Sequence, residues 1–235
     1  MEALTIIAWL SILLGALSAI IIYVDIQMGH YQPMRIMNIA WPVTALFIWP
    51  AVLYVYFKYG RAHVAHNQHQ SSDDHSQDHH HQDQQTPVWV DRYISSTHCA
   101  AGCSLGDILG ESLIYIFGLT IAGSFLWMGY IVDFILALIF GLAFQYYSIK
   151  PMQPNKGTSS LLKQAFKADI LSLISFQIGM YLWMFISVYL IFAESINAGD
   201  PIFWLMMQIA MILGMLTTMP VNKWLIQVGI KHSCH

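Results

Sequence analysis

Apolar residues form long runs along this chain, broken by a few short polar stretches. A helix needs roughly 20 mostly apolar residues to cross a lipid bilayer. Six runs reach about this length: 4–24, 36–57, 103–122, 127–148, 169–192 and 201–221. No stretch alternates between apolar and polar residues as the strands of a membrane β-barrel would. The pattern therefore predicts an all-α membrane protein that is a bundle of about six transmembrane helices.

The composition also indicates a protein that lives in lipid. Of the 235 residues, 57% are hydrophobic and only 10% are charged, whereas a typical soluble domain has about 25% charged residues. The lipid bilayer is the first expected partner, and no motif indicates a nucleic acid or a nucleotide. The first run has no preceding Lys or Arg and no cleavage site of small residues after it. We therefore expect a retained helix rather than a signal peptide.

Basic residues are distributed unevenly around the six predicted helices. Nine of the ten Lys and Arg residues lie on the side of the loop 58–102 and the connection 149–168, and only Arg35 falls on the other side. Cytoplasmic loops of membrane proteins carry an excess of Lys and Arg. We therefore expect both termini and these two connections to be cytoplasmic.

The chain divides into three segments. Residues 1–57 carry the first two predicted helices, residues 58–97 form a polar loop rich in histidine, and residues 98–235 carry helices three to six and a short tail. The loop has almost no apolar residues with which to pack a core, so we expect it to be disordered. Pro42 and Pro50 each remove a backbone donor from the second run and should kink that helix.

Histidine is concentrated in the polar loop. Neutral imidazole binds Zn, Cu, Ni and Fe, so the loop could capture such ions weakly, or it could be a low-complexity spacer. The C-terminal tail could likewise chelate one ion or be inert. The auxiliary metal candidates are His63, His66, His69, His75, His79, His80, His81, His232, Cys234 and His235.

The third predicted helix opens with potential metal ligands. His98 and Cys99 come first, and Cys103, Asp107 and Glu111 follow at four-residue steps. Each step advances about 400° around a helix, so the residues from Cys99 onward form one slowly turning stripe. Thiolate and imidazole ligate soft transition ions, and acids inside a span mark an ion or proton pathway by default. Alternatively, the two acids only hydrogen-bond neighbouring helices. We take these five residues as the main metal candidates.

Small and polar residues predict how this helix packs. Gly102, Gly106 and Gly110 repeat at the same four-residue step on a neighbouring stripe, and such a series lets another helix approach closely in lipid. Asp133 and Gln177 are further polar residues within predicted spans. We expect both to turn toward the interior of the bundle, because exposure to lipid would be costly.

The chain resembles a bacterial integral membrane family, domain of unknown function 4396, in MRIMNIAWPVTALFIWP, HCAAGCSLGDILGE and TTMPVNKWLIQVGIK. The resemblance spans most of the chain outside the histidine-rich loop, and HCxxGCxxGDxxxE is its most specific element. It implies a multi-pass protein of the bacterial inner (cytoplasmic) membrane, and it draws attention to the five main candidates. It implies no established activity.

Two functions of different class therefore stay open. The first is a membrane protein that binds or transports a soft transition-metal ion, copper ahead of zinc, through the Cys/Asp/Glu stripe. The second is a membrane oxidoreductase or assembly factor in which the same cysteines hold a cofactor. We predict no catalytic residues, and an enzyme is the less favoured interpretation. A homo-oligomer is compatible with either function.

Overall fold

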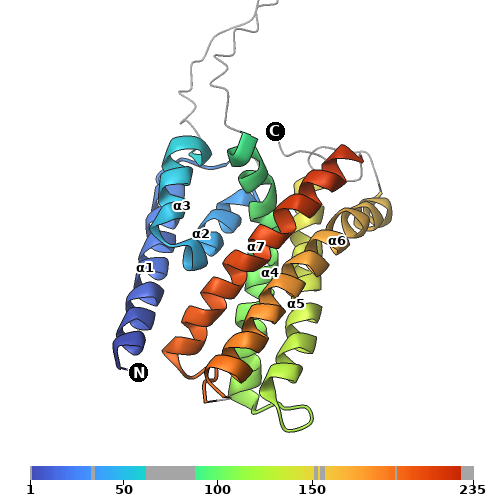
Figure 1. Cartoon of the computed structure of the whole chain (residues 1–235). Coiled ribbons are helices and arrows are strands. Elements are labelled where there is room, and N and C mark those ends of the chain that lie inside the picture. The colour runs from blue at the N-terminus through green and yellow to red at the C-terminus, as the bar shows by residue number, and fades with distance from the viewer. Residues whose placement is uncertain are drawn as a thin grey trace, which may run out of the picture.

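A computed structural model describes residues 2–32, 35–61, 88–150, 153, 157–193 and 195–228. Its elements are α1 (Glu2–Gln27), α2 (Met37–Ile48), α3 (Pro50–Val55), η1 (Tyr56–Gly60), α4 (Val88–Phe117), α5 (Phe125–Ile149), α6 (Thr158–Phe185), η3 (Ile186–Ile191) and α7 (Pro201–Gln227) (Figure 1). These residues contain no β-strand, and five helical segments among them are long and apolar enough to cross a membrane. The all-α membrane bundle is confirmed.

The second predicted span is a hairpin of α2, α3 and η1 instead of one helix. The helix stops at Trp49, whose φ of 54° is left-handed, and restarts at Pro50. The chain then turns back: a Cβ on Gly60 would lie only 2.4 Å from the Trp41 ring. An unbroken helix would separate these two residues by about 28 Å. The kink expected from the prolines is thus a full reversal.

The hairpin closes at the end of the bundle where α1 ends. The carboxylate of Asp25, which is buried near the end of α1, accepts hydrogen bonds from Arg61. Arg61 Nη2 lies 2.7 Å from Asp25 Oδ1, and the Tyr56 hydroxyl donates to Oδ2 at 2.9 Å. The Gln32 side chain donates to the Gly60 carbonyl at 2.7 Å. The hairpin therefore both begins and ends beside the last turn of α1.

The tip of the hairpin reaches only halfway along α1. A Cβ on Gly15 would lie 2.5 Å from the Leu46 carbonyl oxygen. Gly15 is about 20 Å from the start of α1, which is about 39 Å long. The 12 residues of α2 span about 18 Å, against roughly 30 Å for the hydrocarbon core of a bilayer. The hairpin thus fills one leaflet and does not cross the membrane.

Five helices run the length of the bundle, and the hairpin returns to the side from which it starts. The first and last helices therefore begin and finish at opposite ends of the bundle. Glu2 begins α1 at one end of the bundle, and α7 finishes with Gln227 at the other (Figure 1). The prediction that both termini lie on one side is therefore wrong, because it counted the hairpin as a crossing. Helix α4 also begins earlier than expected, at Val88 rather than at residue 98, and residues 62–87 lie outside the described residues.

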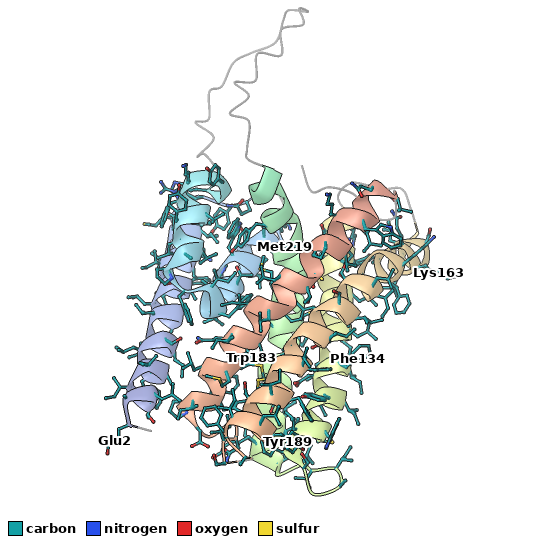
Figure 2. All side chains as sticks on the ribbon, in the orientation of Figure 1. Glu2, Phe134, Lys163, Trp183, Tyr189 and Met219 are labelled. Atoms are coloured by element: carbon teal, nitrogen blue, oxygen red, sulfur yellow. The ribbon has the colours of Figure 1, made fainter. Side chains whose placement is uncertain are left out.

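The corrected topology gathers the basic residues at one end, which we call the basic end. Arg35 was assigned to the opposite side, but it lies between the end of α1 and the start of α2, with the rest. Lys163 and Glu2 mark the two ends in Figure 2. The described basic residues at this end are Arg35, Lys58, Arg61, Arg92, Lys150, Lys163, Lys167 and Lys223. The described part of the chain has no Lys or Arg at the opposite end.

Helices α4 and α5 pack backbone against backbone. A Cβ on Gly102 would lie 2.9 Å from the Gly141 Cα, and one on Gly106 would lie 2.4 Å from the Ala137 backbone nitrogen. No larger residue fits at either position unless the helices separate. The close approach predicted from the glycine repeat is confirmed.

Candidate functional site: a buried polar row on α4

Four of the five main candidates face the interior of the bundle. Cys99, Cys103, Asp107 and Glu111 of α4 are between 0% and 2% exposed, and we call them the α4 row. The thiols of Cys99 and Cys103 contact each other, and both are free cysteines. His98 lies in the same helix, but its side chain lies outside the described residues.

The acids of the α4 row meet polar side chains from α5 and α6. Gln177 of α6 donates from Nε2 to Asp107 Oδ1 at 3.1 Å. The carboxyl groups of Glu111 and Asp133 of α5 form a hydrogen-bonded pair. Two carboxylates cannot share such a contact unless a proton or a cation lies between them. Asp133 and Gln177 turn inward as predicted, and both are almost fully buried.

Glycines shape the space around the carboxyl pair. A Cβ on Gly110 would lie 2.0 Å from Asp133 Oδ1, and one on Gly129 would lie 2.7 Å from Glu111 Oε1. The two carboxyl groups therefore occupy room that side chains would otherwise fill at the α4–α5 contact. Gly110 thus leaves room for the Asp133 side chain, whereas Gly102 and Gly106 leave room for the backbone of α5.

A fourth buried acid in this region was not singled out in the sequence. Asp169 of α6 is 3% exposed, and its Oδ2 would lie 2.7 Å from a Cβ on Gly141, which itself contacts Gly102. This places Asp169 beside the cysteine end of the α4 row. The sequence signal was weak, because Asp169 stands at the edge of an apolar run where a polar residue would ordinarily meet the headgroups.

Several polar atoms in this region have no hydrogen-bond partner among the described residues. They are Asp107 Oδ2, Asp133 Oδ1, Gln177 Oε1 and both carboxyl oxygens of Asp169. An unpartnered buried polar atom is costly, and no Lys or Arg among the described residues forms an ion pair with these acids. The site therefore carries spare acceptor capacity, which a cation, water or protons can use.

A pair of tyrosines lies next to the carboxyl pair. The Tyr130 hydroxyl donates to the Tyr181 carbonyl and the Tyr181 hydroxyl donates to the Tyr130 carbonyl, each at 2.7 Å. Their rings stack with centroids 4.2 Å apart. This reciprocal contact ties α5 to α6 beside the row, and it had no signal in the sequence.

Polar groups continue the α4 row toward the basic end. Asn222 of α7 donates to the Ser96 hydroxyl at 3.0 Å and accepts from the Ser172 hydroxyl at 2.5 Å. All three side chains are buried. The 15 positions from Ser96 to Glu111 correspond to about 22 Å along α4, most of the hydrocarbon thickness.

At its other end, the row meets a cavity. This cavity of about 200 Å³ reaches Glu111 and is also lined by Tyr115, Leu119, Thr120 and Asn197. Tyr115, Thr120 and Asn197 are exposed, so the cavity opens at the end of the bundle opposite the basic residues. Buried polar groups thus extend from the layer around Ser96 to a cavity at the opposite surface.

The described residues hold no group of three or more His, Cys, Asp or Glu side chains arranged to bind one metal ion. The α4 row instead offers ligand pairs at successive depths: the two thiols, then Asp107 with Gln177, then Glu111 with Asp133. The ten auxiliary candidates lie outside the described residues. The metal assignments of all these residues stay predictions.

A family model described as Domain of unknown function (DUF4396) matches residues 88–231. The chain belongs to this family. The DUF4396 segment contains α4 to α7 and with them the whole α4 row, whereas α1 and the hairpin precede it. Two of the three resembling stretches fall inside the match, and MRIMNIAWPVTALFIWP falls outside it. No curated protein and no solved structure matches the chain.

Proposed function

We propose that this DUF4396 protein binds a soft transition-metal ion, copper ahead of zinc, and passes it across the membrane along the α4 row. One observation carries the proposal. Thiol and carboxyl groups lie buried at successive depths of α4 and lead to a cavity at the opposite end. Acids placed inside a span without a basic partner mark an ion path by default.

The chemistry of the row changes along its length. Cys99 and Cys103 present soft sulfur ligands suited to Cu(I) and Zn, while Asp107 and Glu111 present hard oxygen ligands. Each level supplies two protein groups rather than a closed set of four. An ion must be able to leave each site in order to move, and incomplete coordination favours passage over permanent storage.

The orientation follows from the basic end. Because cytoplasmic segments carry the excess of Lys and Arg, the basic end faces the cytoplasm of a bacterial inner membrane, and the cavity at Glu111 faces outward. The described residues that flank the histidine-rich loop, Arg61 and Val88, and the last residues of α7 lie at the basic end. The auxiliary histidines and Cys234 would then collect ions on the cytoplasmic side.

A flux assay with a matched cysteine control tests the proposal. Purified protein is reconstituted into liposomes that trap a metal indicator, and entry of Cu(I) and of Zn²⁺ is measured. Wild type should carry Cu(I) faster than Zn²⁺. The double variant Cys99→Ser/Cys103→Ser should lose most of this flux, whereas Cys234→Ser, which leaves the α4 row and the auxiliary histidines intact, should retain most of it. Equal metal flux into protein-free liposomes and into liposomes that contain the wild-type protein would refute the proposal.

A further inference from the structure

A second cavity lies beneath the tip of the hairpin, between α1 and α7. Its volume is about 370 Å³, within the usual range for pockets that bind small molecules. Its walls include Trp9, Ala16, Leu46, Ile108, Trp204 and Gln208. In Figure 1, α1 and α7 approach each other below the hairpin, toward the start of both helices. This cavity is separate from the one that reaches Glu111.

The depth of this cavity follows from the half-length hairpin. Ala16 is adjacent to Gly15, which contacts Leu46 at the hairpin tip, and Trp9 lies about 10 Å nearer the start of α1. The cavity therefore occupies the leaflet that the hairpin leaves unfilled. In a membrane, that depth is hydrocarbon and not water.

The walls offer almost nothing to water. Apart from the indole N–H groups of Trp9 and Trp204, the Gln208 amide is the one polar side-chain group of the lining residues, and both of its ends are already used. Its Oε1 accepts from the Ser11 hydroxyl, and its Nε2 donates to the Leu46 carbonyl oxygen at 2.8 Å. Water is held in a cavity only where it finds polar partners. A hydrocarbon chain would leave the Gln208 amide satisfied, and also the Trp204 indole N–H, which donates to the Ala198 carbonyl.

We propose that this cavity binds one acyl chain of a membrane phospholipid from the leaflet opposite the basic end. The chain lies under the hairpin tip, and its headgroup lies near Gly199 and Pro201, which line the cavity at that end. Of the two longest parts of the protein outside the described residues, 62–87 stands between η1 and α4 and 229–235 follows α7, both at the basic end. They are attached in the other leaflet, so a lipid is the occupant that the site fits. This inference does not depend on the proposed metal transport.

The bound chain supports the hairpin. The Leu46 carbonyl belongs to the last turn of α2 before the break at Trp49, and Gln208 of α7 donates a hydrogen bond to it. An acyl chain packed against this turn would replace the missing second half of the crossing. We therefore expect phospholipid to stabilise the folded protein as well as to copurify with it.

Cavity-filling variants test the proposal by native mass spectrometry after exhaustive detergent exchange. Ala16→Leu and Ala16→Trp add bulk inside the cavity, and Leu17→Trp adds bulk on the neighbouring exposed position, where Leu17 is 55% exposed. Wild type and Leu17→Trp should each retain one phospholipid more than the two Ala16 variants. Added phospholipid should raise the thermal unfolding midpoint of wild type and Leu17→Trp more than that of Ala16→Leu.

Three results would overturn the proposal. Wild type retaining no phospholipid would show that the cavity does not hold one. Equal retention in Ala16→Leu, the milder variant, would place the lipid elsewhere. Retention of a different hydrophobic molecule by wild type would identify another occupant. Size-exclusion profiles establish that each variant is folded, and the comparison of wild type with Ala16→Leu decides the proposal even if Ala16→Trp does not fold.

Discussion

Replacing Arg61 with glutamine should loosen the hairpin from α1. The Asp25 carboxylate is 6% exposed by its side chain, whereas Arg61 is 40% exposed, so the substitution leaves a buried charge with the Tyr56 hydroxyl as its main donor. Breaking a buried pair costs 3–5 kcal/mol and an exposed pair contributes 0–1 kcal/mol, so we expect a loss of about 2 kcal/mol. For a protein of this size, that corresponds to a drop of roughly 4–8 °C in the unfolding midpoint.

The second half of this prediction is a rescue. Asp25→Asn removes the charge but keeps an acceptor for Tyr56, so Asp25→Asn/Arg61→Gln should be more stable than Arg61→Gln alone. The assay is thermal unfolding of the purified proteins in one detergent. Lys58→Gln is the matched control, because Lys58 is an exposed cation of η1 that contacts only Tyr54 and Tyr59 in the described residues. Two results would refute the reasoning. One is an unfolding midpoint of Arg61→Gln equal to that of Lys58→Gln. The other is a double variant whose midpoint falls by the sum of the decreases seen in Asp25→Asn and in Arg61→Gln.

Three further predictions concern packing, topology and the loop. Gly106→Ala should lower the unfolding midpoint, because the new Cβ would meet the Ala137 backbone. Gly157→Ala should not, because a Cβ there would have no atom within 4 Å. Equal midpoints for the two variants would exclude tight α4–α5 packing. In intact cells, an impermeant thiol reagent should label Ala3→Cys but not Ser72→Cys; labelling at both sites or at neither would contradict opposite ends for the termini. Replacing the seven loop histidines with glutamine should reduce the number of metal ions bound per protein but leave the unfolding midpoint unchanged. A lower midpoint would show that the loop contributes to the fold.

The sequence predicted the fold class but not the path of the second apolar run. A 22-residue run can be one crossing or two half-length legs, because length and hydropathy are the same in both cases. Pro42 and Pro50 marked a weak point, but only tertiary contacts such as Gly60 on Trp41 show that the chain reverses. That one error also displaced Arg35 and the N-terminus to the wrong sides.

That the residues of the α4 row share one face was predictable because the four-residue period of a helix fixes which residues lie on the same side. The same period predicted that the glycines would contact a neighbour. It could not predict the partners, because the pairing of Glu111 with Asp133, and of Asp107 with Gln177, depends on how three helices are offset along their axes. Asp169 was missed because a residue at the edge of an apolar run does not reveal its depth.

The central claim is that an ion passes along the α4 row, and Glu111→Gln tests it most directly. The substitution keeps the size of the side chain and much of its hydrogen bonding but removes the ionisable carboxyl. Glu2→Gln is the control, because Glu2 is an exposed acid at the start of α1. We predict that Glu111→Gln folds and inserts like wild type, yet loses most Cu(I) flux in liposomes, whereas Glu2→Gln retains it. A stable Glu111→Gln protein with wild-type flux would contradict the account.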